Sequence, residues 1–224
     1  MYEYQFLQEQ AYKYLREQIL QDRLEYQHVY SETQIARELG CSRTPVKDAL
    51  TRLSHAKYID ILPSKGFQLH RLTKDDLTNT FQTRVAVESF CAISIMQERD
   101  TQHGAEAISH LRKLLSLQEQ LADGSDIASF LRSDIEFHHS IMHYVDNSDF
   151  AELYELHAYR IEEPARRSLR APDRCREAWR EHTAILDALQ SGEINRCYHA
   201  VLKHNESTFE QSVRLLQSED ASRW

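Results

Sequence analysis

The stretch SETQIARELGCSRTPVKDAL, residues 31–50, decides the fold of the N-terminal part of this chain. Its first half begins with the S-x-x-Q spacing of a capping box and ends at Gly40, which predicts a helix of about two turns. Its second half begins with Ser42 as a candidate cap and carries Pro45 in the first turn, where a missing N–H costs little. Two short helices joined by a turn that contains glycine predict a helix-turn-helix.

The sequence on either side extends this motif. Apolar residues at helical spacing over residues 8–21 predict a scaffold helix before it. After it, residues 58–62 and 67–69 have the composition of short strands, and the Pro-Ser-Lys-Gly turn at residues 63–66 separates them. A hairpin in this position is a wing. We therefore predict that residues 1–72 form a winged helix-turn-helix DNA-binding domain with three helices and a short β-hairpin.

The remainder of the chain, residues 73–224, shows helical spacing with one strong break near Pro172. The whole chain has only 5 Gly and 4 Pro, is 41% hydrophobic and is 28% charged, which is typical of a folded protein rich in helices. The predicted fold class is therefore mainly α. The winged helix-turn-helix is followed by an all-helical bundle of six or seven antiparallel helices.

The net charge of −8 is unevenly distributed along the chain. Residues 1–72 carry 10 basic and 9 acidic side chains, whereas residues 73–224 carry 17 and 26. A DNA-binding domain needs only a local basic surface, because Lys and Arg side chains displace counterions from phosphate whatever the charge elsewhere. The acidic total therefore does not exclude DNA as a partner.

Localisation follows from what the sequence lacks. No stretch approaches the roughly 18 to 20 apolar residues of a membrane span, and residues 1–10 lack the order of a signal peptide. The four cysteines are scattered without a C-x-x-C pair, so we interpret them as buried small residues in a reducing compartment. We expect a cytoplasmic protein with no membrane partner.

The second helix of the motif carries the candidate DNA-reading residues. Its apolar positions face inward and leave Arg43, Thr44 and Lys47 at the N-terminal end, which enters the major groove in such motifs. Arg43 suits bidentate readout of guanine, and Thr44 and Lys47 suit phosphate or base contacts. Lys65 and Gly66 on the wing suit phosphate or the minor groove. The alternative is that each is an ordinary solvated surface residue.

Three helices of the second part place histidines in apolar rows. Asp134 and His138 share a predicted apolar face, and His182 and His204 lie in the apolar rows of two later helices. Buried polar groups must bond one another, water or a metal. Three imidazoles and one carboxylate suit a divalent metal, with Zn²⁺ preferred and Ni²⁺ or Mn²⁺ as alternatives.

Two alternatives to this metal site remain open at the level of sequence. Each histidine, taken alone, is better explained as a core residue whose hydrogen bonds are satisfied within the protein. A second pair, His139 and His143, has the same i, i+4 spacing but lies off the apolar row, so we expect it to be more exposed.

These motifs resemble one known family, the GntR-type bacterial regulators. Residues 31–50 are similar to its helix-turn-helix signature and residues 63–67 to its wing. The resemblance implies that Arg43, Thr44, Lys47 and Gly66 contact the operator. Thr33 stands where many relatives carry a DNA-contacting arginine, so no operator sequence is carried over.

The second part resembles the effector-binding FCD domain of the FadR subfamily of these regulators. The matching residues are Asp134-Ile-Glu-Phe-His138, Asn147, the segment 181–188 with Gly192, and Lys203-His204. The resemblance implies a metal held by Asp134, His138, His182 and His204, with a small carboxylate bound at or beside it. It covers roughly residues 11–209.

Arg84 and Glu88 match the R-x-x-x-E pattern that this family has near its effector pocket. The resemblance implies that Arg84 offers its guanidinium to an effector carboxylate. The alternative for two such residues at i, i+4 is a surface ion pair. Arg160, Arg166 and Arg167 are further candidates for the same role.

The features together predict a ligand-responsive transcriptional regulator, preferably a repressor, that binds a palindromic operator as a homodimer. Residues 73–224 are then the effector-binding and dimerisation domain. One alternative is a constitutive DNA-binding protein whose metal is purely structural. A metalloenzyme is a weaker alternative, because the sequence has no H-E-x-x-H helix and no nucleophile motif.

Overall fold

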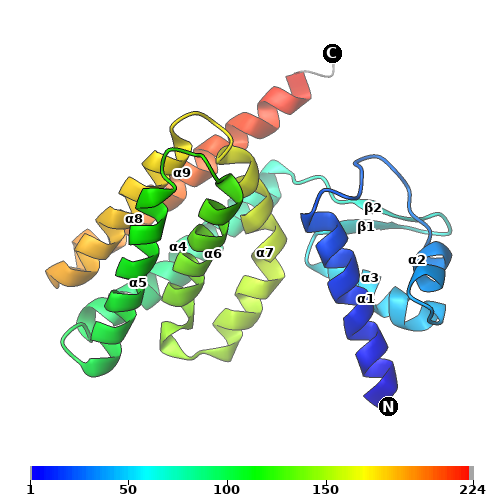
Figure 1. The fold of residues 1–224 in the computed structure, drawn as a ribbon, viewed down its shortest axis with the longest axis horizontal. Coiled ribbons are helices and arrows are strands. Elements are labelled where there is room, and N and C mark those ends of the chain that lie inside the picture. The colour runs from blue at the N-terminus through cyan, green and yellow to red at the C-terminus, as the bar shows by residue number, and fades with distance from the viewer. Residues whose placement is uncertain (1, 222–224) are drawn as a thin grey trace. The chain divides into compact units, whose positions relative to one another are not determined.

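The computed structural model describes residues 2–221, whose regular structure consists of helices and one two-stranded hairpin (Figure 1). The chain divides into two compact units. The first contains the chain up to Leu72 together with Glu155–Tyr159, and the second contains Thr73–Tyr154 and the chain from Arg160 onward. None of the described helices combines the length and the apolar character that crossing a membrane requires.

The first unit contains three helices followed by the hairpin (Figure 1). Their bounds are α1 (Tyr2–Leu20), α2 (Glu32–Glu38), α3 (Arg43–His55), β1 (Ile59–Leu62) and β2 (Gly66–Leu69). This order confirms the predicted winged helix-turn-helix.

Helix α3 is held in place by its apolar row. Val46, Leu50 and Leu53 are completely or almost completely buried, and they pack in one core with Leu15 of α1. Their spacing of three and four residues places them on one side of the helix. The opposite side of α3 therefore faces solvent.

The wing is an antiparallel pair in which Ile59 lies opposite Leu69 and Leu62 lies opposite Gly66. The loop before α2 joins it, because Tyr30 and Phe67 exchange two backbone hydrogen bonds of 2.8 and 3.0 Å. Gly66 has φ +128°, and a Cβ built there would lie 2.0 Å from the Tyr30 carbonyl oxygen. Only glycine fits this close approach between backbones.

Two predicted helix caps differ from expectation. Ser31 and Ser42 do occupy the N-cap positions of α2 and α3, but neither side chain makes the capping hydrogen bond. The capping box at Ser31 is wrong for a physical reason, since the Gln34 amide donates to Glu38 one turn later at 3.0 Å. The structure offers no comparable reason at Ser42.

The second unit is an all-helical bundle of six α-helices and one short 3₁₀ turn within the described residues (Figure 1). The α-helices are α4 (Lys74–Gln97), α5 (Gln102–Gln120), α6 (Ile127–Met142), α7 (Ser148–Ser168), α8 (Arg174–Ser191) and α9 (Ile194–Ala221), and the 3₁₀ turn η1 is His143–Val145. The predicted break near Pro172 separates α7 from α8.

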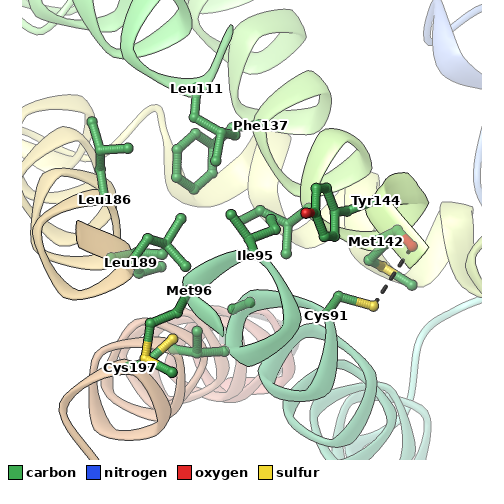
Figure 2. Close-up of a cluster of buried hydrophobic side chains, with 14 of the residues drawn as sticks. Cys91, Ile95, Met96, Leu111, Phe137, Met142, Tyr144, Leu186, Leu189 and Cys197 are labelled. Carbon is green, nitrogen blue, oxygen red and sulfur yellow. Dashed lines mark hydrogen bonds between the residues drawn. The ribbon is translucent and has the colours of Figure 1, made fainter. Parts of the chain in front are cut away.

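The core of this bundle gathers side chains from most of its helices (Figure 2). Ile95 of α4, Leu111 of α5, Phe137 of α6 and Leu189 of α8 are all fully buried in it. Cys91 and Cys197 lie in this core as free thiols, and Cys175 is also buried, as the sequence predicted, whereas Cys41 is only half-buried. The ring of Phe137 also stacks on the ring of His182, with centroids 4.5 Å apart, and so connects the core to a predicted metal ligand.

Candidate metal centre and DNA-binding surface

The N-terminal end of α3 presents the predicted DNA-reading side chains to solvent. Arg43, Thr44 and Lys47 are exposed, whereas the intervening Pro45 and Val46 are buried. The first backbone N–H groups of a helix lack partners inside the helix, so this end also offers backbone donors to phosphate. The arrangement is suited to contact with a polyanion.

Arg43 has an ion-pair partner that sequence reasoning missed. Its Nη2 lies 3.2 Å from Glu32 Oε2 at the start of α2. The Arg43 side chain is 67% exposed, so the pair contributes little to stability and can be exchanged for a base contact. The separation of 11 residues in sequence falls outside any helical spacing rule, because the turn between the two helices creates the contact.

On the wing, Lys65 is exposed at the tip of the turn between the strands, and Gly66 begins β2. The close approach of Gly66 to Tyr30 supplies a structural requirement for glycine that needs no DNA. Lys65 is thus left as the charged side chain that the wing offers to phosphate.

Three histidines from separate helices converge inside the second unit. His138 of α6, His182 of α8 and His204 of α9 are each at most 2% exposed. One ring nitrogen from each lies within 4.8 Å of the others, and the Nε2 atoms of His138 and His204 are 3.1 Å apart. Asp134 Oδ1 lies 3.6 Å from His182 Nε2. The structure therefore brings all four predicted ligands to one place.

A second set of side chains fixes how the rings are turned. The Nδ1 atom of His182 lies 2.8 Å from Gln118 Oε1, and the Nδ1 atom of His204 lies 2.9 Å from Glu181 Oε2. These oxygens accept hydrogen bonds, so each Nδ1 carries the proton and each Nε2 presents a lone pair to the centre.

His138 differs from the other two rings, since its Nδ1 lies 3.2 Å from Glu88 Oε2 but makes no well-aligned hydrogen bond. Its Nε2 faces the Nε2 of His204. The two Nε2 atoms are 3.1 Å apart, so His138 Nε2–H can donate to His204 Nε2, or a cation can replace that proton. His182 Nε2 also has no hydrogen-bond partner although it is fully buried. The Nε2 atom of His182 is therefore the nitrogen of the centre that lacks a donor or a cation.

Burial is the main reason why His182 and His204 stay neutral. Burial lowers the pKa of His182 well below its ordinary value, and the neighbouring His204 and His138 lower it further. Burial also lowers the pKa of His204, although the hydrogen bond to Glu181 opposes this. Neutral imidazole is the form that binds a metal.

The two carboxylates behind the rings stay charged. Burial raises the pKa of Glu181, but the hydrogen bond from His204 and the charge of Arg174 outweigh it and lower this pKa to about 2. Burial likewise opposes ionisation of Glu88, and the charges of Arg84 and His138 outweigh it, so its pKa lies well below the ordinary value. Both carboxylates therefore favour positive charge at the centre.

The residues fit a divalent metal by their donor set. Three imidazole nitrogens and a carboxylate match the ligands of Zn²⁺ and also suit Ni²⁺ or Mn²⁺. Ligand nitrogens about 2.0 to 2.1 Å from a tetrahedral ion are about 3.3 Å apart, close to the 3.1 Å between the Nε2 atoms of His138 and His204.

Arg84 and Glu88 do not form the surface ion pair that was the alternative at the level of sequence. Arg84 Nε donates to Glu88 Oε1 at 2.7 Å, and both side chains are more than nine-tenths buried. Arg84 Nη2 is buried without a partner. It lines a cavity between α4, α7 and α9 that Arg160 and Asn205 also line. An unpaired guanidinium nitrogen in such a cavity can bind an anion.

The remaining candidates differ from Arg84. Arg166 and Arg167 both form ion pairs with Glu163, and the Arg167 Nε to Glu163 Oε1 distance is 2.6 Å. His139 is half-buried and His143 is exposed, as expected, and their rings stack on each other with centroids 3.7 Å apart.

Sequence reasoning missed the groups behind the rings. It named Glu88 only as a partner of Arg84, and it did not single out Gln118. A signal for Gln118 existed, because this residue continues the apolar row of Ile108, Leu111 and Leu115 on α5 and is completely buried. A polar residue in an apolar row predicts a buried partner, as it did for the histidines.

Comparison with known proteins gives matches over both units. The profile described as "Bacterial regulatory proteins, gntR family" matches residues 7–69, and the FCD domain profile matches residues 79–207. The gluconate operon transcriptional repressor of Bacillus subtilis (strain 168) is 28% identical over 174 residues, which are 77% of this chain and 68% of that protein.

Two further matches cover more of the chain. The "Probable D-xylose utilization operon transcriptional repressor" of Paenarthrobacter nicotinovorans is 25% identical over 84% of this chain and 80% of that protein. The solved structure of E. coli McbR/YncC superposes with a TM-score of 0.70 at 20% identity, covering 95% of this chain and 98% of that one. At that identity, the structural likeness shows the fold alone.

Proposed function

The chain belongs to the gntR family of bacterial regulatory proteins and carries an FCD domain. We propose that it is a ligand-responsive repressor with a metal-associated effector site. It is a transcriptional regulator and not an enzyme, since the family and the named relatives regulate transcription. The observation that carries the proposal is the convergence of His138, His182 and His204 on one point.

In this proposal the first unit binds operator DNA. Arg43 reads a base in the major groove, Thr44 and Lys47 hold phosphate or a base, and Lys65 with the Gly66 backbone contacts DNA from the wing. The exposure of these side chains at the end of α3 and at the wing supports the assignment. Two copies related by a two-fold axis would meet the two halves of a palindromic operator in the cytoplasm.

In the second unit, Asp134, His138, His182 and His204 are the proposed ligands of a divalent metal, preferably Zn²⁺. When bound, such an ion would take the lone pairs of the ring nitrogens and offer open coordination positions to a carboxylate. Gln118 and Glu181 orient the rings of His182 and His204 through hydrogen bonds, and Glu88 lies beside His138, which supports a site that is preformed.

The proposed effector is a small carboxylate. Arg84 supports this class, because its Nη2 is a buried donor without a partner in a cavity that Arg160 also lines. The gluconate operon repressor among the relatives supports it as well, since gluconate is a carboxylate. Effector binding would shift the population of bundle conformations and hence the affinity for the operator.

Metal analysis tests the site most directly. Purified protein loaded with Zn²⁺ and dialysed is compared by mass spectrometry with the double variant His182→Ala, His204→Ala. We expect about one ion per chain in the parent and little in the variant, because removing two of four ligands abolishes the shell. The matched control is His110→Ala, His199→Ala, which removes two exposed histidines.

Equal metal content in the parent and in the His182→Ala, His204→Ala variant would contradict the proposal. A second experiment, in which an effector is added, distinguishes a ligand sensor from a constitutive DNA-binding protein with a structural metal. Gluconate is added to the metal-loaded protein on an operator selected from a random duplex library. A change in operator affinity that Arg84→Gln abolishes supports sensing, whereas an unchanged affinity with every carboxylate tried supports the constitutive alternative.

A further inference from the structure

Helix α2 places an acidic side chain against the residue that is proposed to read a base. Glu32 is the first residue of α2, and its Oε2 lies 3.2 Å from Nη2 of Arg43, the first residue of α3. The Glu32 side chain is only 21% exposed, whereas that of Arg43 is 67% exposed. The carboxylate is therefore the more confined partner, and the guanidinium is the one that reaches into solvent.

The two helix ends favour this pair unequally. The N-terminal end of a helix carries partial positive charge, which stabilises an acid and destabilises a cation in the first turn. Glu32 is thus stabilised by its own helix, while Arg43 is destabilised by its own. Arg43 has no other hydrogen-bond or ion-pair partner among the described residues. Without Glu32, its long side chain would sample many rotamers.

The geometry leaves Arg43 able to read guanine while it stays paired. A guanidinium has five N–H donors, and two of its edges each present a parallel pair, one from Nη1 and Nη2 and the other from Nε and Nη2. Glu32 Oε2 accepts from Nη2 alone. Whichever Nη2 hydrogen it accepts, one complete edge remains for the O6 and N7 acceptors of guanine. The exchange of the pair for a base contact is therefore allowed but not required.

Contact of Arg43 with phosphate is different. If Arg43 reached the DNA backbone with the pair intact, the Glu32 carboxylate would meet a full negative charge, whereas guanine O6 and N7 carry only partial charges. If Arg43 turned away to reach phosphate, the carboxylate would lose its cation. A phosphate contact also carries no sequence information. The pair thus favours guanine over phosphate as the partner of Arg43.

We propose that Glu32 is a positioning residue that sets the base specificity of this regulator. It holds the Arg43 guanidinium for guanine and keeps it from phosphate, and it contacts no base itself. Because Arg43 is restrained before DNA arrives, less rotamer freedom is lost upon binding. This inference rests on the proposed function, since it requires that Arg43 reads a base.

The competing explanation is an ordinary surface ion pair. Such a pair contributes little to stability, and loss of Glu32 would then change the affinity for all DNA sequences alike, through the loss of one negative charge. A positioning role instead changes the preference at one base pair, the one that Arg43 reads. Measurement of base preference position by position therefore distinguishes the two explanations.

The test uses the full chain and an operator duplex selected from a random library, in which each base pair is then replaced in turn. Fluorescence anisotropy gives the affinity of the parent, Arg43→Ala, Glu32→Gln and the double variant for each duplex. The position at which Arg43→Ala loses discrimination is the base pair that Arg43 reads. We expect Glu32→Gln to lower discrimination at this position by about fivefold, which corresponds to the ordering of one long side chain. In the Arg43→Ala background it should have no further effect there.

A second measurement is the salt dependence of binding to a duplex of unrelated sequence. If Glu32→Gln frees Arg43 for phosphate, the slope of log affinity against log salt steepens by about 0.9, the value for one added contact. Arg43→Ala in the same chain should remove this increase. The matched control is Glu38→Gln, which removes one exposed acidic charge from the same helix and should alter neither the base preference nor the slope.

Circular dichroism confirms that each variant is folded. If folded Glu32→Gln keeps the discrimination or the salt slope of the parent, or if Glu38→Gln changes them as much, Glu32 is an ordinary surface acid and this inference is wrong, while the DNA-reading role of Arg43 still stands. If Arg43→Ala loses discrimination at no position, the proposed role of Arg43 fails and this inference fails with it.

Discussion

Gln118 orients a candidate metal ligand without reaching the metal position itself. Its Oε1 accepts from His182 Nδ1 at 2.8 Å, and its Nε2 donates to the Ser133 carbonyl oxygen at 3.1 Å. The first bond selects the tautomer of His182, and the second fixes the amide so that its oxygen faces the ring. The side chain thus has one role in the site and one in packing, and two substitutions can separate them.

We predict that Gln118→Met weakens Zn²⁺ binding by about 10- to 100-fold, because His182 loses the acceptor that holds its Nδ1 proton. Gln118→Glu loses the bond to Ser133 and buries a carboxyl group, but it keeps the acceptor for His182 Nδ1, so it should retain much more Zn²⁺ affinity than Gln118→Met. Competition with a coloured chelator measures both affinities. If the two variants lose affinity equally, Gln118 acts through packing and not through His182.

The three buried histidines show which parts of a buried site can be predicted from the sequence. His138, His182 and His204 were recognisable because each interrupts an apolar row of its own helix, which is a local signal. Their partners depend on tertiary contacts. Glu181 precedes His182 in sequence yet bonds His204 on the next helix, and no spacing rule connects residues 23 positions apart. The ligands could be predicted, but the hydrogen bonds that orient them could not.

At the scale of elements, the wing depends on one glycine. Gly66→Ala would place a Cβ 2.0 Å from the Tyr30 carbonyl oxygen, at a φ of +128° that side chains rarely adopt. We expect the free energy of unfolding of the first unit to fall by more than about 2 kcal/mol, because the Tyr30 bridge to Phe67 must open. Urea unfolding followed by circular dichroism measures the change.

Gly40→Ala is the matched control for this substitution. Gly40 lies in the turn of the helix-turn-helix at φ +63°, but an added Cβ there meets nothing within 4 Å. Its cost should therefore be limited to about 1 kcal/mol for the left-handed conformation. Equal costs for the two variants would show that the approach to Tyr30 does not constrain the wing.

Local sequence predicted the helices and strands better than it predicted the hydrogen bonds that cap the helices. The S-x-x-Q spacing at residues 31–34 correctly predicted where α2 begins, but the expected capping bond is absent because Gln34 donates to Glu38. Conversely, Thr73 and Asp76 form a complete capping box at the start of α4 that was not predicted. Position in sequence predicts that a helix starts, whereas competition among nearby side chains decides which hydrogen bond forms there.

For the whole molecule, the uneven distribution of charge can be predicted from the sequence alone. Which charged groups of the second unit are buried cannot. Composition gives the acidity of residues 73–224. It does not tell which carboxylates lie inside, and Glu88 is only 1% exposed. Buried groups with shifted pKa values link stability to pH, so the interior of this unit determines how the molecule responds to acid.

The metal-free protein should lose stability between pH 7.5 and pH 5.5. Burial lowers the pKa of His182 and of His204, so both rings are neutral in the folded state, whereas in the unfolded chain they titrate near 6.5. Below that pH the unfolded state binds more protons, and the free energy of unfolding falls as the pH falls. Glu181, with its pKa lowered to about 2, loses its contribution only at much lower pH.

Each histidine contributes up to about 1.4 kcal/mol at pH 5.5, so a loss of about 2 kcal/mol is expected for the pair. Urea unfolding in a chelator, followed by Trp179 fluorescence in a Trp224→Phe background, measures it in the second unit. His182→Phe removes one titrating ring from the core and should reduce the loss by about half, while His110→Gln at the surface should leave it unchanged. A free energy of unfolding that is equal at the two pH values would mean that these rings are not held neutral, and the site would then lack the lone pairs that a metal needs.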